Sequence, residues 1–434
     1  MVKITYRLLS LTILVLFLSC KRERNKAAKP KESSIVGQTV HSIEKKQVIA
    51  STEIKNINFY FENSGSINGY LSGTNFLKTM HYIIDDSDER LIPYFVNSKE
   101  YKTKNILSKI DEKRIKTVGT SSSDHKFIFT NAIKSAIGNN LSVVVTDGIY
   151  STPNGNIGVV EVEIEKAFKR ALKVNEIETV VIKMASKYSG MYYTGSGCVN
   201  IKINQERPYY IILFGSKKMI NRGLEDIGKL DGLPGFEEQA RFLLTKNFNA
   251  GYSILTYSED IKGSFKPTVR DSSLVKDIED AERFSKGGEQ YLQIPIAVDY
   301  SGTSLPFSYV EDIENYSVTG GTGYEIVEIK PITSVNASSH TYQNVKKINK
   351  DSNIQLSHII IIKAKLKATG SLSIVLENNM PSWIKATGQE NDCEIKGNTT
   401  QTYAFDRLIS GISKAYIAIN QNKHYLKMNF NIKH

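Results

Sequence analysis

The stretch Leu141-Ser142-Val143-Val144-Val145-Thr146-Asp147-Gly148 decides how the first half of this chain is expected to fold. Three consecutive valines are typical of a strand that is covered by helices on both faces, because both faces of such a strand must be apolar. The run Tyr210 to Leu213 has the same character. Together the two runs predict a central sheet buried between layers of helices.

Outward from this strand, apolar strand patterns alternate with helical patterns between about Ile54 and Lys246. The expected strands are Ile57 to Phe61, Leu91 to Val96, Leu141 to Thr146, Glu178 to Met184 and Tyr209 to Phe214. The expected helices are Thr74 to Ile84, a stretch within Asp124 to Ile137, Val159 to Val174, Met219 to Leu230 and Phe236 to Leu244. A hairpin is expected between Met191 and Arg207. This alternation predicts an α/β domain with a doubly wound, mostly parallel sheet over residues 51–248.

Beyond about Asn249 the apolar residues follow a period of two, as in Leu292 to Val298 and Leu426 to Ile432. Half-buried strands have this period. The pattern predicts an antiparallel, β-rich domain of sandwich type over residues 249–434, with one late helix at Thr402 to Ser413.

The first 20 residues have the pattern of a secretory signal. A basic start precedes the apolar run Leu8 to Leu18, which is much shorter than the roughly 20 residues needed to cross a bilayer. Ser19-Cys20 follows, and this segment resembles the lipobox of bacterial lipoproteins. The resemblance implies removal of residues 1–19 and a diacylated Cys20, so that the protein is anchored to a membrane by lipid.

The polar residues 20–50 are expected to form a flexible tether, because they contain too few apolar side chains to pack. The stretch Lys21 to Arg24 lacks an acidic run, which favours the periplasmic face of the outer membrane over the cell surface. The net charge of +11 is spread over the chain. With no basic and aromatic cluster, the sequence does not favour nucleic acid as a partner.

Besides Cys20, the chain contains only Cys198 and Cys393. This number excludes a disulfide scaffold and a cysteine-based metal site. In an oxidising compartment the two thiols could pair, and the bond would then join the two halves of the chain. The sequence leaves both alternatives open, a disulfide and two free thiols.

Short oxygen-bearing side chains follow two of the predicted strands. Glu62, Ser64 and Ser66 come after the first strand, and Asp147 comes after the central one. In an open α/β sheet, the loops at the carboxyl ends of the strands converge on the ligand-binding edge. Oxygen donors of this kind suit Mg²⁺ or Mn²⁺.

These residues resemble the metal-ion-dependent adhesion site of von Willebrand factor A domains, whose pattern is Asp-x-Ser-x-Ser, a distant Thr and a Thr-Asp-Gly segment. Ser64 and Ser66 match the two serines, and Asp147 matches the distant aspartate. Glu62 stands where the family has Asp. For the threonine, Ser123 is the best candidate, since its hydroxyl would also cap the following helix, and Thr130 is the second. The resemblance implies a binding module whose metal or polar edge receives an acidic group of a protein partner.

Three other interpretations remain. Serine, glycine and asparagine are common turn residues, so the same loops could form a polar edge without a metal. A serine hydrolase would use Ser64 or Ser66 as nucleophile, with His125 as the one histidine on a neighbouring loop. A structural envelope lipoprotein would bind nothing. Because no complete catalytic constellation is recognisable, the sequence favours a binding protein over an enzyme.

Overall fold

The structure is a computed structural model that describes residues 53–433, with gaps at 114, 120, 151–156, 227–229, 246–249, 271, 321–322, 366–369 and 421–422. The predicted signal peptide (residues 1–19), Cys20 and the tether (residues 20–50) lie outside the described residues. Among the helices of the described part, none combines the length and the apolar character needed to cross a membrane.

A seven-stranded sheet forms the centre of the first half, in the order β3-β2-β1-β4-β6-β5-β7. Only β2, β1 and β4 run parallel to one another, and the remaining neighbours are antiparallel. The chain is therefore α/β, but its sheet is mixed and not mostly parallel. The strands are β1 (Asn56–Glu62), β2 (Leu91–Val96), β3 (Glu100–Lys102), β4 (Asn140–Thr146), β5 (Glu178–Tyr192), β6 (Ile201–Gly215) and β7 (Phe236–Phe242).

The antiparallel part of the sheet has a local cause. The chain from β5 to β6 is a long hairpin, as expected between Met191 and Arg207, and a hairpin pairs its two strands antiparallel. The expected helix at Phe236 to Leu244 is wrong, because this segment forms β7 at the edge of the sheet beside β5. The few apolar residues of this segment fit both periods, because Phe236, Ala240 and Leu243 follow a helical spacing whereas Phe236, Ala240 and Phe242 follow the even spacing of a strand. Pairing with β5 determines the outcome.

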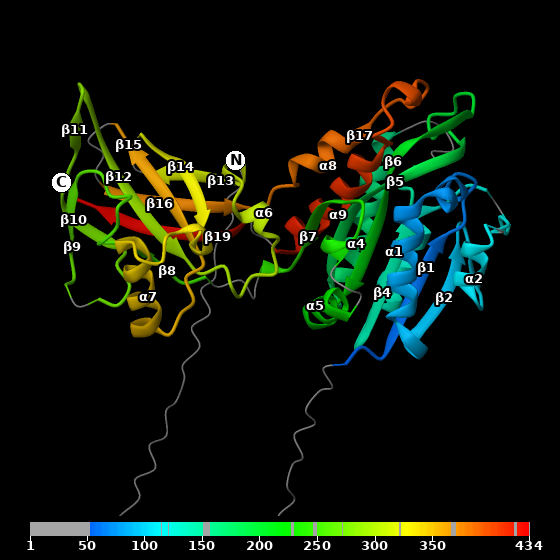
Figure 1. Cartoon of the computed structure of the whole chain (residues 1–434), viewed down its shortest axis with the longest axis horizontal. Coiled ribbons are helices and arrows are strands. Elements are labelled where there is room, and N and C mark those ends of the chain that lie inside the picture. Colours follow the sequence, from blue (N-terminus) through cyan, green and yellow to red (C-terminus); the bar gives the residue numbers. More distant parts are fainter. Residues whose placement is uncertain are drawn as a thin grey trace, which may run out of the picture. The chain divides into compact units, whose positions relative to one another are not determined.

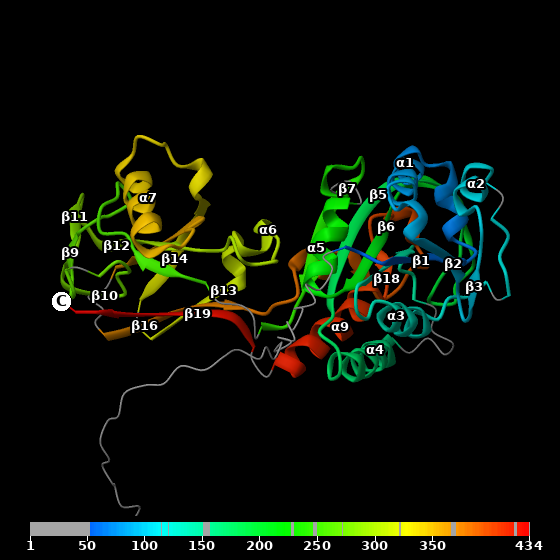
Figure 2. The same cartoon turned by 90° about the horizontal axis from the view of Figure 1, so that it is seen from below.

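Helices cover both faces of this sheet (Figures 1 and 2). Helix α1 (Thr74–Asp85) lies on one face, and α3 (His125–Ser135), α4 (Ile157–Leu172) and α9 (Phe405–Asn420) lie on the other. Two further helices of this region are α2 (Ile106–Asp111) and α5 (Lys217–Asp226). The fully buried valines of β4 confirm the expectation of a strand covered on both faces.

The chain returns to this first core near its carboxyl end. Ile384, Ile395 and the buried apolar residues between Tyr403 and Tyr416 belong to the same hydrophobic cluster as β1 and β4. Helix α9 packs closely on α4, since a Cβ added at Gly411 would lie 2.6 Å from the carbonyl oxygen of Glu161. The late helix that the sequence predicts at Thr402 to Ser413 therefore exists as α9, but it packs with the α/β half and not with the β-rich half.

The β-rich part contains two five-stranded sheets whose residues share one hydrophobic core. Neighbouring strands are antiparallel except for β10 and β19. One sheet has the order β13-β16-β19-β10-β9 and the other contains β11, β12, β15, β14 and β8. Their bounds are β8 (Tyr252–Ile254), β9 (Ser264–Pro267), β10 (Asp277–Glu282), β11 (Phe284–Lys286), β12 (Glu289–Val298), β13 (Tyr316–Gly320), β14 (Tyr324–Pro331), β15 (His358–Ala364), β16 (Gly370–Glu377) and β19 (His424–Ile432).

Short elements complete the described chain. They are the helices α6 (Phe307–Val310), α7 (His340–Ser352) and α8 (Ser382–Thr387) and the paired strands β17 (Gly388–Gln389) and β18 (Thr402–Tyr403). Strand β18 directly precedes α9, so it belongs to the segment that returns to the first core.

Candidate functional site

The residues singled out in the sequence converge at one end of the parallel strands. Strands β1 and β4 are hydrogen-bonded neighbours, and their register places Phe61 beside Val145. The segment after each strand therefore leaves the sheet at the same edge. The five predicted residues, Glu62, Ser64, Ser66, Ser123 and Asp147, are all buried there.

Asp147 is held by the loop that follows β1 and by its own turn. The hydroxyl of Ser66 donates a hydrogen bond to Asp147 Oδ2, and the amide of Ile149 donates to Oδ1 at 3.0 Å. The hydroxyl oxygens of Ser64 and Ser66 lie 3.3 Å apart. Two serines and one carboxylate from different strands thus form a continuous polar cluster, as the spacing of the residues predicts.

Glu62 is held mainly by the segment that follows β4. The hydroxyl of Thr146 donates to Glu62 Oε2, and the amide of Asp147 donates to the same oxygen at 3.2 Å. The amide of Gly148 donates to Thr146 Oγ1 at 2.8 Å, which orients this hydroxyl. The Ser123 hydroxyl lies close enough to the Glu62 carboxyl group to lower its pKa, but within the described residues this buried hydroxyl makes no hydrogen bond. Glu62 and Asp147 are therefore linked through both backbone and side chains.

Two details of the prediction differ from the structure. The N-cap of α3 is Asp124, whose carboxylate accepts the amide of Phe127 at 2.9 Å, so Ser123 does not cap this helix. Thr130, the second candidate for the family's threonine, lies on α3 and lines a groove between α3 and α4. Ser123 is thus the hydroxyl that joins the cluster, and Thr130 is not.

Both carboxyl groups are destabilised in their charged form. Burial raises the pKa of Glu62, although the surrounding hydroxyl groups partly oppose this shift. Burial also raises the pKa of Asp147, the nearby charge of Glu62 raises it further, and the hydrogen bond from Ser66 opposes both effects. Two acids that share a dry site compete for the charged state, so the pair favours protons or a cation.

His125 completes the cluster from the first turn of α3. Its Nε2 lies 3.2 Å from Thr146 Oγ1, and its ring stacks on Tyr150 with centroids 5.6 Å apart. Burial lowers the pKa of His125, so the neutral imidazole is favoured. Because Thr146 donates its proton to Glu62, Nε2–H of His125 is the donor toward Thr146. In the described residues His125 therefore supports Thr146 and is not hydrogen-bonded to Ser64 or Ser66.

The donor set fits a hard divalent cation. Two carboxylates and the hydroxyls of the three serines supply oxygen atoms only, which Mg²⁺ and Mn²⁺ prefer. The described residues contain no group of three or more His, Cys, Asp or Glu side chains placed to hold a metal, so a cation here would depend on the hydroxyls. Glu62 Oε2 already accepts two hydrogen bonds from the segment that follows β4.

The site is covered by aromatic side chains. A Cβ at Gly65 would lie 2.6 Å from the ring of Tyr193, and a Cβ at Gly148 would lie 2.6 Å from Tyr210 and 3.0 Å from Phe405. Gly148 also has φ of +70°, which favours glycine. Asp147 is only 1% exposed, so the polar edge that the sequence predicts is formed but does not lie open.

Part of this cover is supplied by the carboxyl-terminal half of the chain. The ring of Phe405 stacks on Tyr210 with centroids 3.7 Å apart, and the hydroxyl oxygens of Tyr210 and Thr402 lie 2.9 Å apart. The amide of Tyr150 donates to the carbonyl of Tyr403 at 3.4 Å. Residues 402–405 therefore pack against the Asp147 loop.

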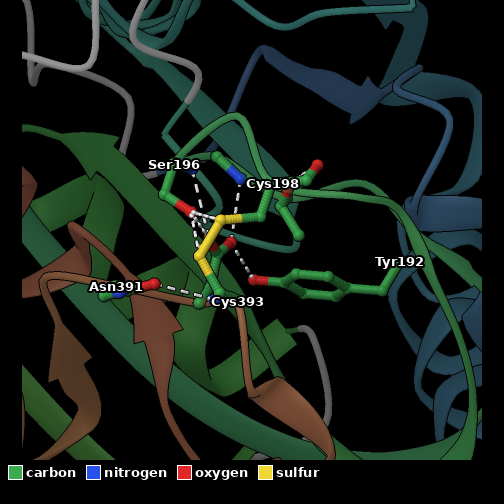
Figure 3. Close-up of a disulfide and its surroundings, with 8 residues drawn as sticks. Tyr192, Ser196, Cys198, Asn391 and Cys393 are labelled. Atoms are coloured by element: carbon green, nitrogen blue, oxygen red, sulfur yellow. Dashed lines mark hydrogen bonds between the residues drawn. A yellow bond between two sulfur atoms is a disulfide. The ribbon is translucent and has the colours of Figure 1, made fainter.

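A disulfide joins Cys393, which precedes residues 402–405 in the chain, to Cys198 at the tip of the β5–β6 hairpin (Figure 3). Cys198 and Cys393 are bonded, with 5.4 Å between their Cα atoms, which resolves the alternatives left open by the sequence. The neighbouring Asp392 is fully buried and accepts hydrogen bonds from Tyr192 Oη at 2.8 Å and from the amide and hydroxyl of Ser196. The hairpin tip and the segment around residue 393 are thus held together by both covalent and polar bonds.

Arg207, in β6, makes a third set of contacts between the hairpin and the carboxyl-terminal segment. It is 1% exposed, its guanidinium lies 4.5 Å from the ring centroid of Tyr192, and it donates to the carbonyls of Thr399 and Gln401 at 3.3 Å each. A buried guanidinium is stabilised by such carbonyl and aromatic contacts. The cover of the site is therefore anchored along its length.

Comparison of the chain with family models, with curated proteins and with solved structures found no match. The site therefore rests on its own geometry. Sequence reasoning missed the hydroxyl of Thr146 as a partner of Glu62, although the Thr-Asp-Gly segment contains it. It also missed the aromatic cover formed by Tyr193 and Phe405, because nothing in the sequence indicates that residues 402–405 return to the first core.

Proposed function

We propose that this protein is a membrane-tethered, extracytoplasmic binding module, in which a divergent metal-ion-dependent adhesion site of von Willebrand factor A type recognises an acidic group of a protein partner. The proposal includes a lipid anchor at Cys20 and a sandwich-like arrangement of the two β-rich sheets. The lipid places the module at a membrane surface, and the β-rich part spaces it from its surroundings.

The observation that carries this proposal is the convergence of two carboxylates and three serine hydroxyls from three separate loops. Glu62 and Asp147 lie in a dry site where the pKa of each is raised. No cation of the described residues pairs with Asp147, and Glu62 has only His125 Nε2 at 3.9 Å, on a ring that is favoured neutral. A divalent ion would neutralise both acids, and Ser64 and Ser66 would be among its oxygen ligands.

Recognition of an outside acid requires the cover to move. Tyr193 is 42% exposed, so its side chain is the outermost part of the cover over Gly65. Residues 402–405 are fastened more strongly, because they are part of the segment bound by Arg207 and the disulfide. We therefore place the entry for a partner's carboxylate at Tyr193 and not at Phe405.

The test is a titration of a soluble form that begins at Lys21 with Mg²⁺ and with Mn²⁺, followed by calorimetry and by the electron paramagnetic resonance of Mn²⁺. We expect saturable binding of one ion that Asp147→Asn abolishes. Asp86→Asn removes an exposed acid on the same domain and serves as the matched control, which should bind the ion as the unchanged protein does. Binding that is absent, or equal in both variants, would remove the metal from the proposal.

The two other functions considered from the sequence are not favoured. A nucleophilic serine needs a base within hydrogen-bond reach. Among the described residues, the nearest imidazole, His125, contacts Thr146 instead of Ser64 or Ser66. A purely structural lipoprotein would have no reason to bury two acids side by side, since this arrangement costs stability.

A further inference from the structure

We propose that the groove between α3 and α4 binds an acidic amphipathic helix of a partner protein. The groove has a volume of about 700 Å³, within the range of natural ligand sites. It is separate from the buried acids of the candidate site. This inference therefore goes beyond the proposed function and stands or falls independently of it.

The two helices run side by side along the groove. Lys126 and Glu163 form an ion pair of 3.5 Å at one end, and the rings of Phe129 and Phe168 meet beneath it with centroids 6.2 Å apart. From Lys126 to Ser135 the α3 side spans about 14 Å at a helical rise of about 1.5 Å per residue. The groove therefore matches between two and three turns of a helix lying in it.

The floor and the far end of the groove are apolar. Ala167 and Ala171 are one turn apart on α4 and are small enough for another helix to approach closely. Ile137 and Val174, at the far end, are 42% and 78% exposed. Apolar side chains at these helical spacings are what a helix-binding groove offers to the apolar face of its ligand.

The rims of the groove are basic. Lys134 on the α3 side and Lys166 and Arg170 on the α4 side are exposed, and within the described part of the chain none of the three forms an ion pair. Lys126 is already paired with Glu163. Carboxylates on both flanks of a bound helix would complement these three cations, and the positive net charge of the chain would speed the encounter.

The distribution of charge favours a helix over a lipid. An anionic lipid carries its charge at one end and buries its chains in an enclosed channel. Here the cations stand on both rims of an open groove, with apolar residues between and beyond them. Repeated carboxylates along a helix match this pattern, whereas one headgroup does not.

The first test uses fluorescence anisotropy of a fluorescein-labelled peptide of leucine, alanine and glutamate, arranged as an amphipathic helix, with a scrambled peptide of equal composition as comparison. We expect the amphipathic peptide to bind the protein saturably and the scrambled one to bind at least about tenfold more weakly, because only the first aligns its carboxylates with both rims. Equal binding of both peptides, or none, would overturn the proposal.

The second test locates the binding. The triple variant Lys134→Glu, Lys166→Glu, Arg170→Glu should weaken binding of the amphipathic peptide by at least about tenfold. The matched control is Lys346→Glu, Lys347→Glu, Lys350→Glu, which changes the charge of three exposed residues of α7 by the same amount. Equal losses in both variants would reduce the effect to net charge and overturn the assignment to the groove.

A third variant tests the floor without changing charge. Ala171→Trp fills the groove and should abolish peptide binding in a protein whose circular dichroism and melting temperature are unchanged. If Ala171→Trp does not fold, the triple variant carries the test by itself. Vesicles of phosphatidylglycerol provide the last comparison. Vesicle binding that depends on Lys134, Lys166 and Arg170, in the absence of peptide binding, would replace the proposal with a lipid surface.

Discussion

The seven-stranded sheet buries carboxylates in two places and treats them differently. At the start of β5, Glu178 is paired with Arg241 of β7, whose Nε donates to Glu178 Oε2 at 2.8 Å, and both side chains are at most 9% exposed. At the ends of β1 and β4, Glu62 and Asp147 are buried beside one another. Burial raises the pKa of both, and the charge of Glu62 raises that of Asp147 further.

The difference separates a structural feature from a functional candidate. A buried acid that accepts two hydrogen bonds from one guanidinium is satisfied by the fold itself. The charge of a buried pair of acids is neutralised only by protons or by a cation from outside, so the fold loses stability there at neutral pH. Local cost of this kind is typical of sites that bind something, and we regard Glu62 and Asp147 as such a site.

The largest effect on stability is expected from a change in the Glu178–Arg241 ion pair. Arg241→Ala leaves the carboxylate of Glu178 buried without its partner, and loss of one member of a buried ion pair costs about 3–5 kcal/mol. Urea denaturation should show a correspondingly lower midpoint. The control is the double variant Glu178→Leu, Arg241→Met, which removes both charges and should remain close to the unchanged protein. If Arg241→Ala is harmless, Glu178 is not the structural case that the comparison assumes.

A smaller effect is expected from removing the Cys198–Cys393 disulfide, which helps to hold the cover over Glu62 and Asp147. The double variant Cys198→Ser, Cys393→Ser removes a crosslink between residues 195 positions apart. Loss of a native disulfide typically costs about 2–5 kcal/mol. Arg207, Asp392 and Phe405 still fasten the same segment, which places the expected loss at the lower end of this range.

The readout for this variant is local. Amide hydrogen exchange should increase at residues 192–198 and 390–405 and remain unchanged in Glu178 to Met184, which pairs with β7. A uniform increase over the whole sheet would mean that the disulfide stabilises the fold in general and does not specifically hold the cover.

Much of the first half is predictable from the sequence because its determinants are local. The consecutive valines of β4 indicate a strand covered on both faces, and the positions of Ser66 and Asp147 after β1 and β4 indicate that the two meet. Adjacent parallel strands that end together bring the residues that follow them together, which is why Ser66 and Asp147 are expected to meet.

What the sequence does not predict depends on contacts between distant parts of the chain. The antiparallel order of β6, β5 and β7 follows from pairing that apolar periodicity cannot distinguish, which is why Phe236 to Leu244 is misinterpreted as a helix. The return of Phe405 to the first core, and with it the covered state of Asp147, depends on packing between residues more than 250 positions apart. Such packing leaves no periodic pattern.

The smallest expected effect tests the unsatisfied pair itself. Asp147→Asn keeps the shape of the side chain, its oxygen can accept from the Ile149 amide, and its amide group can donate to the Ser66 hydroxyl, but it removes one of the two charges. In the absence of divalent ions we expect this variant to be more stable than the unchanged protein by about 1 kcal/mol at pH 8. Charge removal at Asp86, which is exposed, should leave the stability unchanged.

The pH dependence follows from the direction of the shifts. In the folded protein the pKa of both Glu62 and Asp147 lies above the ordinary value near 4, so the folded state binds protons more tightly than the unfolded state. The stability that this pair contributes is present at acid pH and is lost as the pH rises through the folded-state pKa. The advantage of Asp147→Asn should therefore be largest at pH 8 and shrink toward pH 5 in urea denaturation.

Because a divalent ion must displace these protons, added Mn²⁺ should stabilise the unchanged protein more at pH 8 than at pH 5, and should not stabilise Asp147→Asn at either pH. An advantage of Asp147→Asn that is the same at both pH values would mean that the two acids do not compete for charge, and the difference between this site and the Glu178–Arg241 pair would disappear.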